Sequence, residues 1–245
     1  MAPKKQIQAK SLETKKLTKA AANKALLAAR KPAAALEALA SGADPNTMER
    51  DESVLYWRLF QARFDVAQVL VDHGADIECA TESGTLLIGL CDCENEKINK
   101  PELAIALWLI GHGASCTQAR PDGTTPLMHA ARARNSRVII DALIAHGARP
   151  VPDNHGDTPL HWAVSAECGD PWVWRRLLEI GNDLEAKNRH GETPLSLAQT
   201  AGSREAVTFL LARGADRNVT VNGKTLLQRA TAAKQPKKML ALLGG

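Results

Sequence analysis

Apolar residues recur at helical spacing along most of the chain, in blocks separated by polar segments that contain glycine. In the segment 204–214, REAVTFLLARG, they lie three and four residues apart, as on one buried face of a helix. The longest apolar run, LAIALWLIG at 103–111, is too short to span a bilayer. No alternation of apolar and polar residues typical of extended strands is present. The pattern predicts an all-α protein.

Two short phrases recur in a fixed order. The first is Thr-Pro-Leu or a variant of it, at 84–90, 124–131, 155–164, 192–199 and 224–230. The second surrounds a glycine, at Gly42, Gly74, Gly113, Gly147, Gly181 and Gly214, so that the steps are 32, 39, 34, 34 and 33 residues. A period near 33 residues indicates a repeat architecture.

Both phrases suit the ends of helices. Thr158 can accept a hydrogen bond from a free amide at a helix start, and Pro159 fits the first helical position, where no backbone hydrogen bond is lost. Leu160 then turns inward. Gly181 and its equivalents suit the left-handed residue that ends a helix. The sequence therefore predicts helices that begin at the first phrase and helices that end at the second.

On these phrases, residues 20–245 resemble the ankyrin-repeat family. The resemblance implies an all-α repeat solenoid, an ankyrin-repeat stack of about seven helix-turn-helix units with short β-hairpin fingers. Each unit would hold a short inner helix that begins at the Thr-Pro-Leu phrase, a longer outer helix, and a loop that leads into a finger. Each repeat would contact only its neighbours.

The phrases also predict the boundaries of the units. We expect a basic flexible tail at 1–15, an N-terminal capping repeat at 16–46, repeats at 47–78, 79–117, 118–151, 152–185 and 186–218, and a C-terminal capping repeat at 219–245. The repeat at 79–117 has about seven extra residues within 91–102, between its two helices. We expect Pro101 to begin its outer helix and Trp108 to lie in the core. Of Trp172 and Trp174, at least one should reach the convex surface.

Charge and cysteine usage narrow the class of protein. Residues 1–31 hold nine Lys and Arg residues against Glu13 alone, whereas the remaining residues hold 22 basic and 26 acidic ones. The basic segment suits either a solvated chain end or contact with nucleic acid. Lys24 interrupts the only apolar segment near the start, so we expect no secretion signal. Because the number of cysteines is odd, at five, and no secretion signal is expected, we predict reduced thiols and a cytoplasmic protein.

His161 follows Thr158 by three residues, and a histidine in such a motif could be a catalytic base. The same position of the other units holds Tyr56, Ile88, Met128, Ser196 and Gln228. A catalytic base could not be exchanged so freely, and the ankyrin resemblance implies a structural hydrogen bond to the capping threonine. His73, His112 and His146 precede the loop glycines, where a donor side chain meets free carbonyls at the end of a helix.

No metal site, cofactor site or catalytic site is expected. Cys91 and Cys93 suggest a zinc site together with Cys79 and Cys116. In the repeat geometry, however, the two pairs lie at opposite ends of an inner helix about 13 Å long. Four zinc ligands must lie within about 2.3 Å of one point. No nucleophile elbow, glycine-rich phosphate loop or His-Glu-x-x-His motif is present. We therefore expect no enzyme.

The position after the histidine position is the best candidate for binding. The ankyrin resemblance places it on the concave face, and it reads Trp57, Gly89, His129, Trp162, Leu197 and Arg229 along the chain. Exposed Trp and Arg side chains dominate the energetics of interfaces. The alternative is packing between neighbouring repeats. The candidate partner-binding residues are Trp57, Phe60, His129, Arg132, Trp162, Leu197 and Arg229.

Two hypotheses of function follow. The first is a non-enzymatic protein-protein interaction module, a monomer that binds a protein partner through its concave face and fingers. A stoichiometric inhibitor or antidote of an enzyme is one form of this hypothesis. An acidic set (Asp72, Asp76, Glu78, Glu82) and a basic set (Arg120, Arg132, Arg134, Arg137) would orient that partner. The alternative is a nucleic-acid-associated regulator that uses the basic tail while the repeats recruit a protein. No contact with a membrane is expected.

Overall fold

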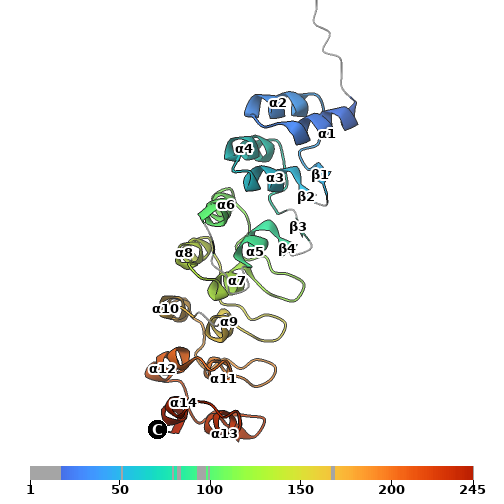
Figure 1. The fold of residues 1–245 in the computed structure, drawn as a ribbon. Coiled ribbons are helices and arrows are strands. Elements are labelled where there is room, and N and C mark those ends of the chain that lie inside the picture. Colours follow the sequence, from blue (N-terminus) through green and yellow to red (C-terminus); the bar gives the residue numbers. More distant parts are fainter. Residues whose placement is uncertain are drawn as a thin grey trace, which may run out of the picture. The chain divides into compact units, whose positions relative to one another are not determined.

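The chain is organised as successive pairs of helices. The computed structural model describes residues 18–50, 52–78, 80–81, 84–92, 98, 100–166 and 169–244. Within these residues it contains fourteen helices and six strands of two residues each, and no closed sheet (Figure 1). They divide into a first unit that ends at Asp76 and a second unit that begins at Ile77. The predicted all-α architecture is confirmed.

The described residues of the first unit form four helices and one hairpin. Its elements are α1 (Lys19–Ala28), α2 (Pro32–Ala40), β1 (Met48–Glu49), β2 (Glu52–Ser53), α3 (Val54–Phe60) and α4 (Phe64–Asp72). Helix α1 packs on α2, α3 on α4, and α2 on α4. Leu26, Leu59 and Leu70 are fully buried between them. The Ser53 hydroxyl begins α3 by accepting a hydrogen bond from the Tyr56 amide at 3.1 Å, as an N-cap residue does.

The second unit contains five inner helices and five outer helices among its described residues. The inner helices are α5 (Leu86–Cys91), α7 (Pro126–Arg132), α9 (Pro159–Ser165), α11 (Pro194–Thr200) and α13 (Leu226–Ala232). The outer helices are α6 (Lys100–Gly111), α8 (Arg137–Ala145), α10 (Pro171–Glu179), α12 (Arg204–Ala212) and α14 (Lys237–Gly244). Two antiparallel hairpins precede α5 and α13, formed by β3 (Ala80–Thr81) with β4 (Gly84–Thr85) and by β5 (Thr220–Val221) with β6 (Lys224–Thr225).

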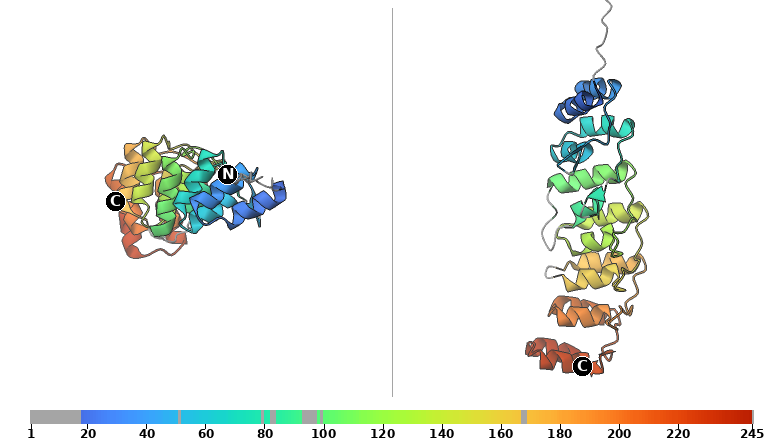
Figure 2. Two further views of the ribbon diagram at one scale, coloured as in Figure 1. Left: turned by 90° about the horizontal axis from the view of Figure 1, so that it is seen from above. Right: turned by 90° about the vertical axis from the view of Figure 1, so that its right-hand side faces the viewer.

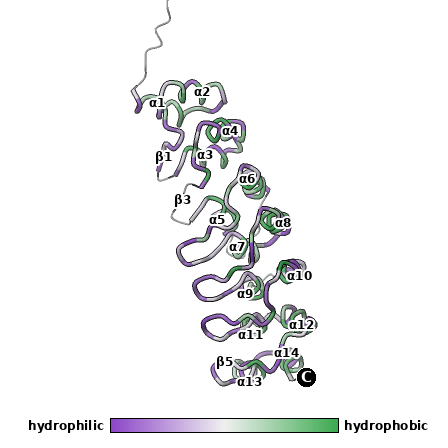
Figure 3. Tube along the Cα trace, turned by 180° about the vertical axis from the view of Figure 1, so that it is seen from behind, coloured by the Kyte–Doolittle hydropathy of each residue, from purple (hydrophilic) through white to green (hydrophobic). Residues whose placement is uncertain are grey.

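The inner and outer helices form two rows in the second unit. Each inner helix packs on its own outer helix and on the next inner helix, and Figure 1 shows the inner row beside the loops. The helices from α7 onward lie roughly parallel in the right-hand view of Figure 2. The loops that follow α6, α8 and α10 are hydrophilic, whereas green apolar segments lie on the helices (Figure 3). The core is therefore between the rows, and the loops project from the inner row.

The predicted helix starts are confirmed. Thr125 and Thr193 accept hydrogen bonds from the amides of Met128 and Ser196 at 3.4 and 3.3 Å. Thr158 forms a capping box with His161, and a proline occupies the first turn of α7, α9 and α11. These contacts satisfy amides that the start of a helix leaves free.

The predicted helix ends are also confirmed. The six loop glycines have φ angles between +88° and +96°, which side chains with a Cβ rarely adopt. His73, His112 and His146 each place Nδ1 at 2.7 to 2.9 Å from the carbonyl oxygen four residues earlier. The Nδ1–H donates to that oxygen in each case, because a carbonyl can only accept.

Loops without strands replace the predicted hairpin fingers before α7, α9 and α11. Backbone hydrogen bonds close each loop, among them those from the amides of Arg120, Asp153 and Asn188 to the carbonyls of Thr124, Asp157 and Glu192, at 2.9 to 3.0 Å. Neighbouring loops are joined as well. The Asn154 amide donates to the Asp122 carbonyl at 2.9 Å, and the Arg189 amide donates to the His155 carbonyl at 2.8 Å. We call these three loops the fingers of the second unit.

The tryptophans of the outer helices differ in burial. Trp174 is buried, and its indole donates to the Ala163 carbonyl at 3.1 Å. Trp172 is only half-buried, which confirms that one of this pair reaches the surface. The prediction that Trp108 is a core residue is wrong, because the ring is half-buried and stacks on His112 with the ring centroids 3.9 Å apart. The spacing of apolar residues in the sequence places Trp108 on a helix, but it does not show whether another helix covers that side chain.

The predicted insertion falls largely outside the described residues, which lack 93–97 and 99. Helix α5 ends at Cys91 and α6 begins at Lys100, so Pro101 lies in the first turn of α6. Across the described part of the chain, no helix is long and apolar enough to cross a membrane.

Gly123 tests whether the fingers depend on close backbone contact. A Cβ at Gly123, where φ is +86°, would lie 2.7 Å from the Asn154 amide nitrogen, whereas a Cβ at Gly147, where φ is +96°, would meet nothing within 4 Å. We expect Gly147→Ala to lower the free energy of unfolding by about 1–2 kcal/mol, the cost of a left-handed Ala. Gly123→Ala should cost more, because the next finger must also move. Urea unfolding measures both, and equal losses would contradict the contact.

Candidate functional site

The candidate residues fall into two groups that belong to different units. Trp162, Leu197 and Arg229 are half-buried on the inner row of the second unit, and Arg132 is half-buried at the end of α7. Trp57 and Phe60 belong to α3 of the first unit. The residues at the shared repeat position of α9, α11 and α13 thus lie alike on the inner row.

Trp162 is held from three directions. Its indole Nε1 donates to Asp153 Oδ2 at 3.0 Å, and Asp153 belongs to a finger. The Arg132 guanidinium lies over the ring, 5.2 Å from its centroid. The edge of the ring meets His129, with the ring centroids 5.3 Å apart and the planes at 63°. A large aromatic side chain is thus fixed in orientation while part of its surface stays open to solvent.

His129 is not a surface residue, which corrects its place among the partner-binding candidates. The side chain is 5% exposed and turns away from solvent into a polar cluster. His129 Nε2 lies 3.1 Å from Arg120 Nη1, and His129 Nδ1 lies 3.0 Å from Asp92 Oδ1. A guanidinium can only donate, so Nε2 accepts and the Nδ1–H donates to the carboxylate. The small Gly89 occupies the same position of α5.

Asp92 and Arg120 complete this cluster, and the sequence analysis did not join them. Arg120 Nη2 donates to Asp92 Oδ2 at 2.8 Å. Burial alone would raise the pKa of Asp92, but the hydrogen bonds from Arg120 and His129 and the charge of Arg120 outweigh burial, so the pKa is lowered. Burial lowers the pKa of His129, and Arg120 acts in the same direction against the opposing charge of Asp92. The cluster therefore holds an ionised Asp92 beside a neutral His129.

The basic set proposed from the sequence is partly neutralised. Arg120 is paired with Asp92, and Arg137 forms an ion pair with Asp170 in which Nε lies 2.7 Å from Oδ2. Of the acidic set, Glu82 lies outside the described residues. A partner would therefore meet less positive charge beside α7 and α8 than the sequence indicates.

His161 is structural, as predicted. It is fully buried, and its Nδ1 accepts a hydrogen bond from the Thr158 amide at 3.1 Å. Nε2 lies 3.1 Å from the Glu192 carbonyl oxygen and donates to it. Burial lowers the pKa of His161, against the hydrogen bond to Glu192. The neutral imidazole thus closes its own helix start and joins it to the next finger.

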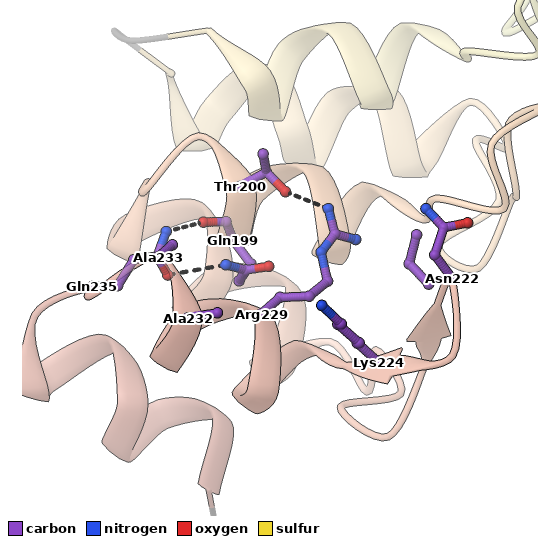
Figure 4. Close-up of a pocket in the computed structure, with 9 residues that line it drawn as sticks. Gln199, Thr200, Asn222, Lys224, Arg229, Ala232, Ala233 and Gln235 are labelled. Atoms are coloured by element: carbon purple, nitrogen blue, oxygen red, sulfur yellow. Dashed lines mark hydrogen bonds between the residues drawn. The ribbon is translucent and has the colours of Figure 1, made fainter.

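An open cavity of about 530 Å³ lies at the end of the inner row, between α11, α13 and the hairpin β5–β6 (Figure 4). Arg229 Nη2 donates to Thr200 Oγ1 at 2.9 Å and to Glu192 Oε1 at 3.0 Å. Gln199 and Gln235 pair by reciprocal hydrogen bonds across the cavity floor. The carboxylate of Glu192 reduces the charge that Arg229 presents.

The aromatic residues of the first unit form a separate cluster. The Trp57 indole donates to the Glu49 carbonyl at 3.2 Å, and the Tyr56 and Trp57 ring centroids are 5.4 Å apart. Phe60 is 49% exposed and contacts Tyr56 with a centroid distance of 4.5 Å. Both candidates of this unit thus reach the surface of α3.

The structure tests the cysteine question only in part. Cys79 and Cys93 lie outside the described residues, while Cys91 and Cys116 are buried. Burial raises the pKa of Cys116, and the charge of Glu78 raises it further. Over the described ranges, no group of three or more His, Cys, Asp or Glu residues is arranged to hold a metal ion.

Comparison with known proteins agrees with the geometry. A family model described as "Ankyrin repeats (3 copies)" matches residues 96–188 and 164–245. The chain belongs to the ankyrin-repeat family. Ankyrin repeats are a protein-protein interaction module without enzymatic activity of their own.

Similar proteins are much longer than this chain. An E3 ubiquitin-protein ligase KEG of Arabidopsis thaliana is 28% identical over 195 residues, 75% of this chain and 12% of that protein. Rabankyrin-5 of Homo sapiens is 31% identical over 206 residues, 69% of this chain and 17% of that protein. The chain therefore spans less than a fifth of either relative, and an enzymatic activity named for a relative does not pass to this ankyrin-repeat chain.

The lowered pKa of His161 predicts a loss of stability in acid. The unfolded chain, in which the pKa is about 6.5, takes up the proton first, so the stabilisation is complete above about pH 6.5 and is lost as the pH falls toward the folded pKa. We expect the melting temperature of the parent protein to fall as the pH is lowered from 7 to 5. The melting temperature of His161→Gln should fall less steeply over the same range. The glutamine should keep the cap, because Gln228 Oε1 accepts from the Thr225 amide at 2.9 Å. Calorimetry at several pH values measures both slopes, and equal slopes would contradict the prediction.

Proposed function

We propose that this chain is a non-enzymatic module that binds a protein partner through the inner row and fingers of the second unit. The observation that carries the proposal is the fixed, partly exposed Trp162, tied to a finger through Asp153 and covered on one face by Arg132. Tryptophan and arginine are enriched at the residues that dominate binding energy. An aromatic side chain that is already fixed loses little conformational entropy on binding.

Leu197 and Arg229 extend this proposed surface. They occupy the same repeat position as Trp162 on α11 and α13, and these inner helices pack in sequence. An aromatic, an aliphatic and a cationic side chain then follow one another along the row. Such a surface fits a protein better than a small molecule, because its members are distributed over three helices.

We further propose that the module is a cytoplasmic inhibitor or antidote of an enzyme. Fingers that are joined by backbone hydrogen bonds form a surface whose shape is set before binding, and such a surface suits the covering of another protein's cleft. We assign the helix pairs to seven ankyrin repeats with the boundaries predicted from the sequence.

A nucleic-acid-associated regulator is the alternative function. Lys24, Arg30 and Lys31 are exposed at α1 and continue the basic composition of the preceding residues. Lys19 is partly engaged, with Nζ at 3.4 Å from Asp44 Oδ2. Tight DNA binding that weakens steeply with salt and disappears when residues 1–15 are removed would favour this alternative.

Trp162→Ala tests the proposed surface, and Trp172→Ala is the matched control. Both indoles are half-buried and lie under an arginine, at 5.2 Å for Arg132 and 5.7 Å for Arg137, but Trp172 lies on an outer helix. We expect Trp162→Ala to weaken partner binding by about 2 kcal/mol or more, roughly thirtyfold, as at an interface hot spot. Trp172→Ala should leave binding unchanged.

The partner is first captured from native lysate on the immobilised chain, and its affinity is then measured by calorimetry for both variants. Thermal melting shows whether each variant remains folded. Equal affinity of the two variants, or a loss confined to Trp172→Ala, would place the partner elsewhere and contradict the proposed surface.

A further inference from the structure

An open cavity of about 380 Å³ lies within the first unit. The end of α1, the hairpin β1–β2 and helix α3 form its walls. The lining residues are Leu27, Ala28, Arg30, Glu49, Arg50, Trp57, Arg58 and Gln61. Three arginines and one carboxylate thus face a single cavity beside an indole ring.

Arg58 is buried in the wall of this cavity and is only 3% exposed. The repeats at α7, α9, α11 and α13 have alanine at the equivalent position, so this arginine departs from the repeat pattern. Its Nη2 donates to the carbonyl of Leu26 at 3.3 Å and to that of Leu27, and Nη1 donates to Gln61 Oε1 at 3.1 Å. Nε is buried without a hydrogen-bond partner. The guanidinium is therefore held in place by neutral acceptors alone.

Within the described part of the first unit, the arginines of the cavity form no ion pair. The ion pairs formed among the described residues include none of Arg30, Arg50 and Arg58. Arg30 and Arg50 are exposed at the rim. Burial lowers the pKa of Arg58, and the nearby charge of Arg30 lowers it further, against the opposing charge of Glu49. A buried cation with cationic neighbours costs free energy unless an anion accompanies it.

We propose that this cavity binds a carboxylate side chain from an acidic segment of a protein partner. Arg58 supplies the fixed charge of the wall, while Arg30 and Arg50 close on the carboxylate from the rim, since a planar guanidinium matches a carboxylate in two parallel hydrogen bonds. The inference rests on the proposed function in taking the partner to be a protein.

The Glu49 carboxylate limits the positive charge of the site. It is one of the lining residues and reduces the net charge of the lining to about two positive charges. A dianionic phosphate or two carboxylates of one acidic segment match that charge equally, so the preference for a carboxylate rests on the apolar ring beside the arginines. Trp57, which donates to the Glu49 carbonyl at 3.2 Å, places an apolar ring beside the site for the methylene groups of a glutamate.

The full 245-residue chain, labelled with ¹⁵N at its tryptophan indoles, tests the proposal by titration with an acetylated, amidated tetraglutamate peptide. We expect a saturable shift of the Trp57 signal, identified by its absence in Trp57→Phe, and no shift of the Trp162 signal. Tetraglutamine should shift neither. The double variant Arg30→Gln and Arg50→Gln should weaken tetraglutamate binding about tenfold, as expected for the loss of two exposed charge contacts.

Arg63→Gln is the matched control, because Arg63 is exposed on the same unit but does not line the cavity. Three results would overturn the proposal: an equal response to tetraglutamine, an equal loss in Arg63→Gln, or tighter binding of inorganic phosphate or an oligothymidylate than of tetraglutamate. Thermal melting confirms folding, and the rim variants should melt as the parent does, since both rim arginines are exposed.

Failure here is separable from failure of the proposed function. Trp162→Ala lies in the second unit and should bind tetraglutamate normally. If that variant loses the protein partner while tetraglutamate does not bind the parent chain, the proposed function stands and the carboxylate site is wrong. If tetraglutamate binds as described and Trp162→Ala keeps the partner, the carboxylate site stands and the proposed surface is wrong.

Discussion

The burial of each inner helix between its neighbours is the constraint on which the second unit depends. A helix of seven residues cannot bury enough apolar surface to be stable by itself, and Leu127, Leu160 and Leu195 become fully buried only because successive inner helices pack on one another. Hydrogen bonds then fix how neighbours align. His161 shows this most directly, since one ring atom closes the start of α9 and the other reaches the Glu192 carbonyl of the next finger. The same side chain therefore both caps its own helix and joins that helix to the next repeat.

The packing of the inner helices and fingers in turn determines the orientation of the side chains at the surface of the inner row. Because the backbone of each finger donates to the preceding finger, Asp153 is held by its neighbours and can orient the Trp162 indole. Two hydrogen bonds to the Asp153 carboxylate, from the amides of His155 and Asp157 at 2.8 and 2.9 Å, further restrict it. The orientation of the partly exposed Trp162 ring thus depends on Asp153 and the fingers, and through them on the packing of the inner helices.

Sequence reasoning was reliable where the cause is local. Thr158, Pro159 and Gly181 act within one helix turn of where they stand, so their roles follow from the phrase that contains them. It failed where burial depends on distant partners. The burial of His129 requires Asp92, which lies 37 residues earlier and has no repeat pattern to mark it. Arg58 carried a usable signal, because an arginine stands at the position where α7, α9, α11 and α13 have alanine.

The repeat position that holds Trp162 shows how one scaffold can serve different partners. Three partly exposed occupants are each tied to a finger or hairpin: Trp57 to the Glu49 carbonyl, Trp162 to Asp153, and Arg229 to Glu192. The acceptor is in one case a backbone carbonyl and in the others a carboxylate, so the support does not require one particular side chain. Beneath Trp162 and Arg229 the inner helices keep a buried leucine and a buried alanine, whereas α3 keeps the leucine and has Arg58 in place of the alanine. A change of residue at this position therefore alters what the surface offers to a partner without altering the packing that holds the surface in place.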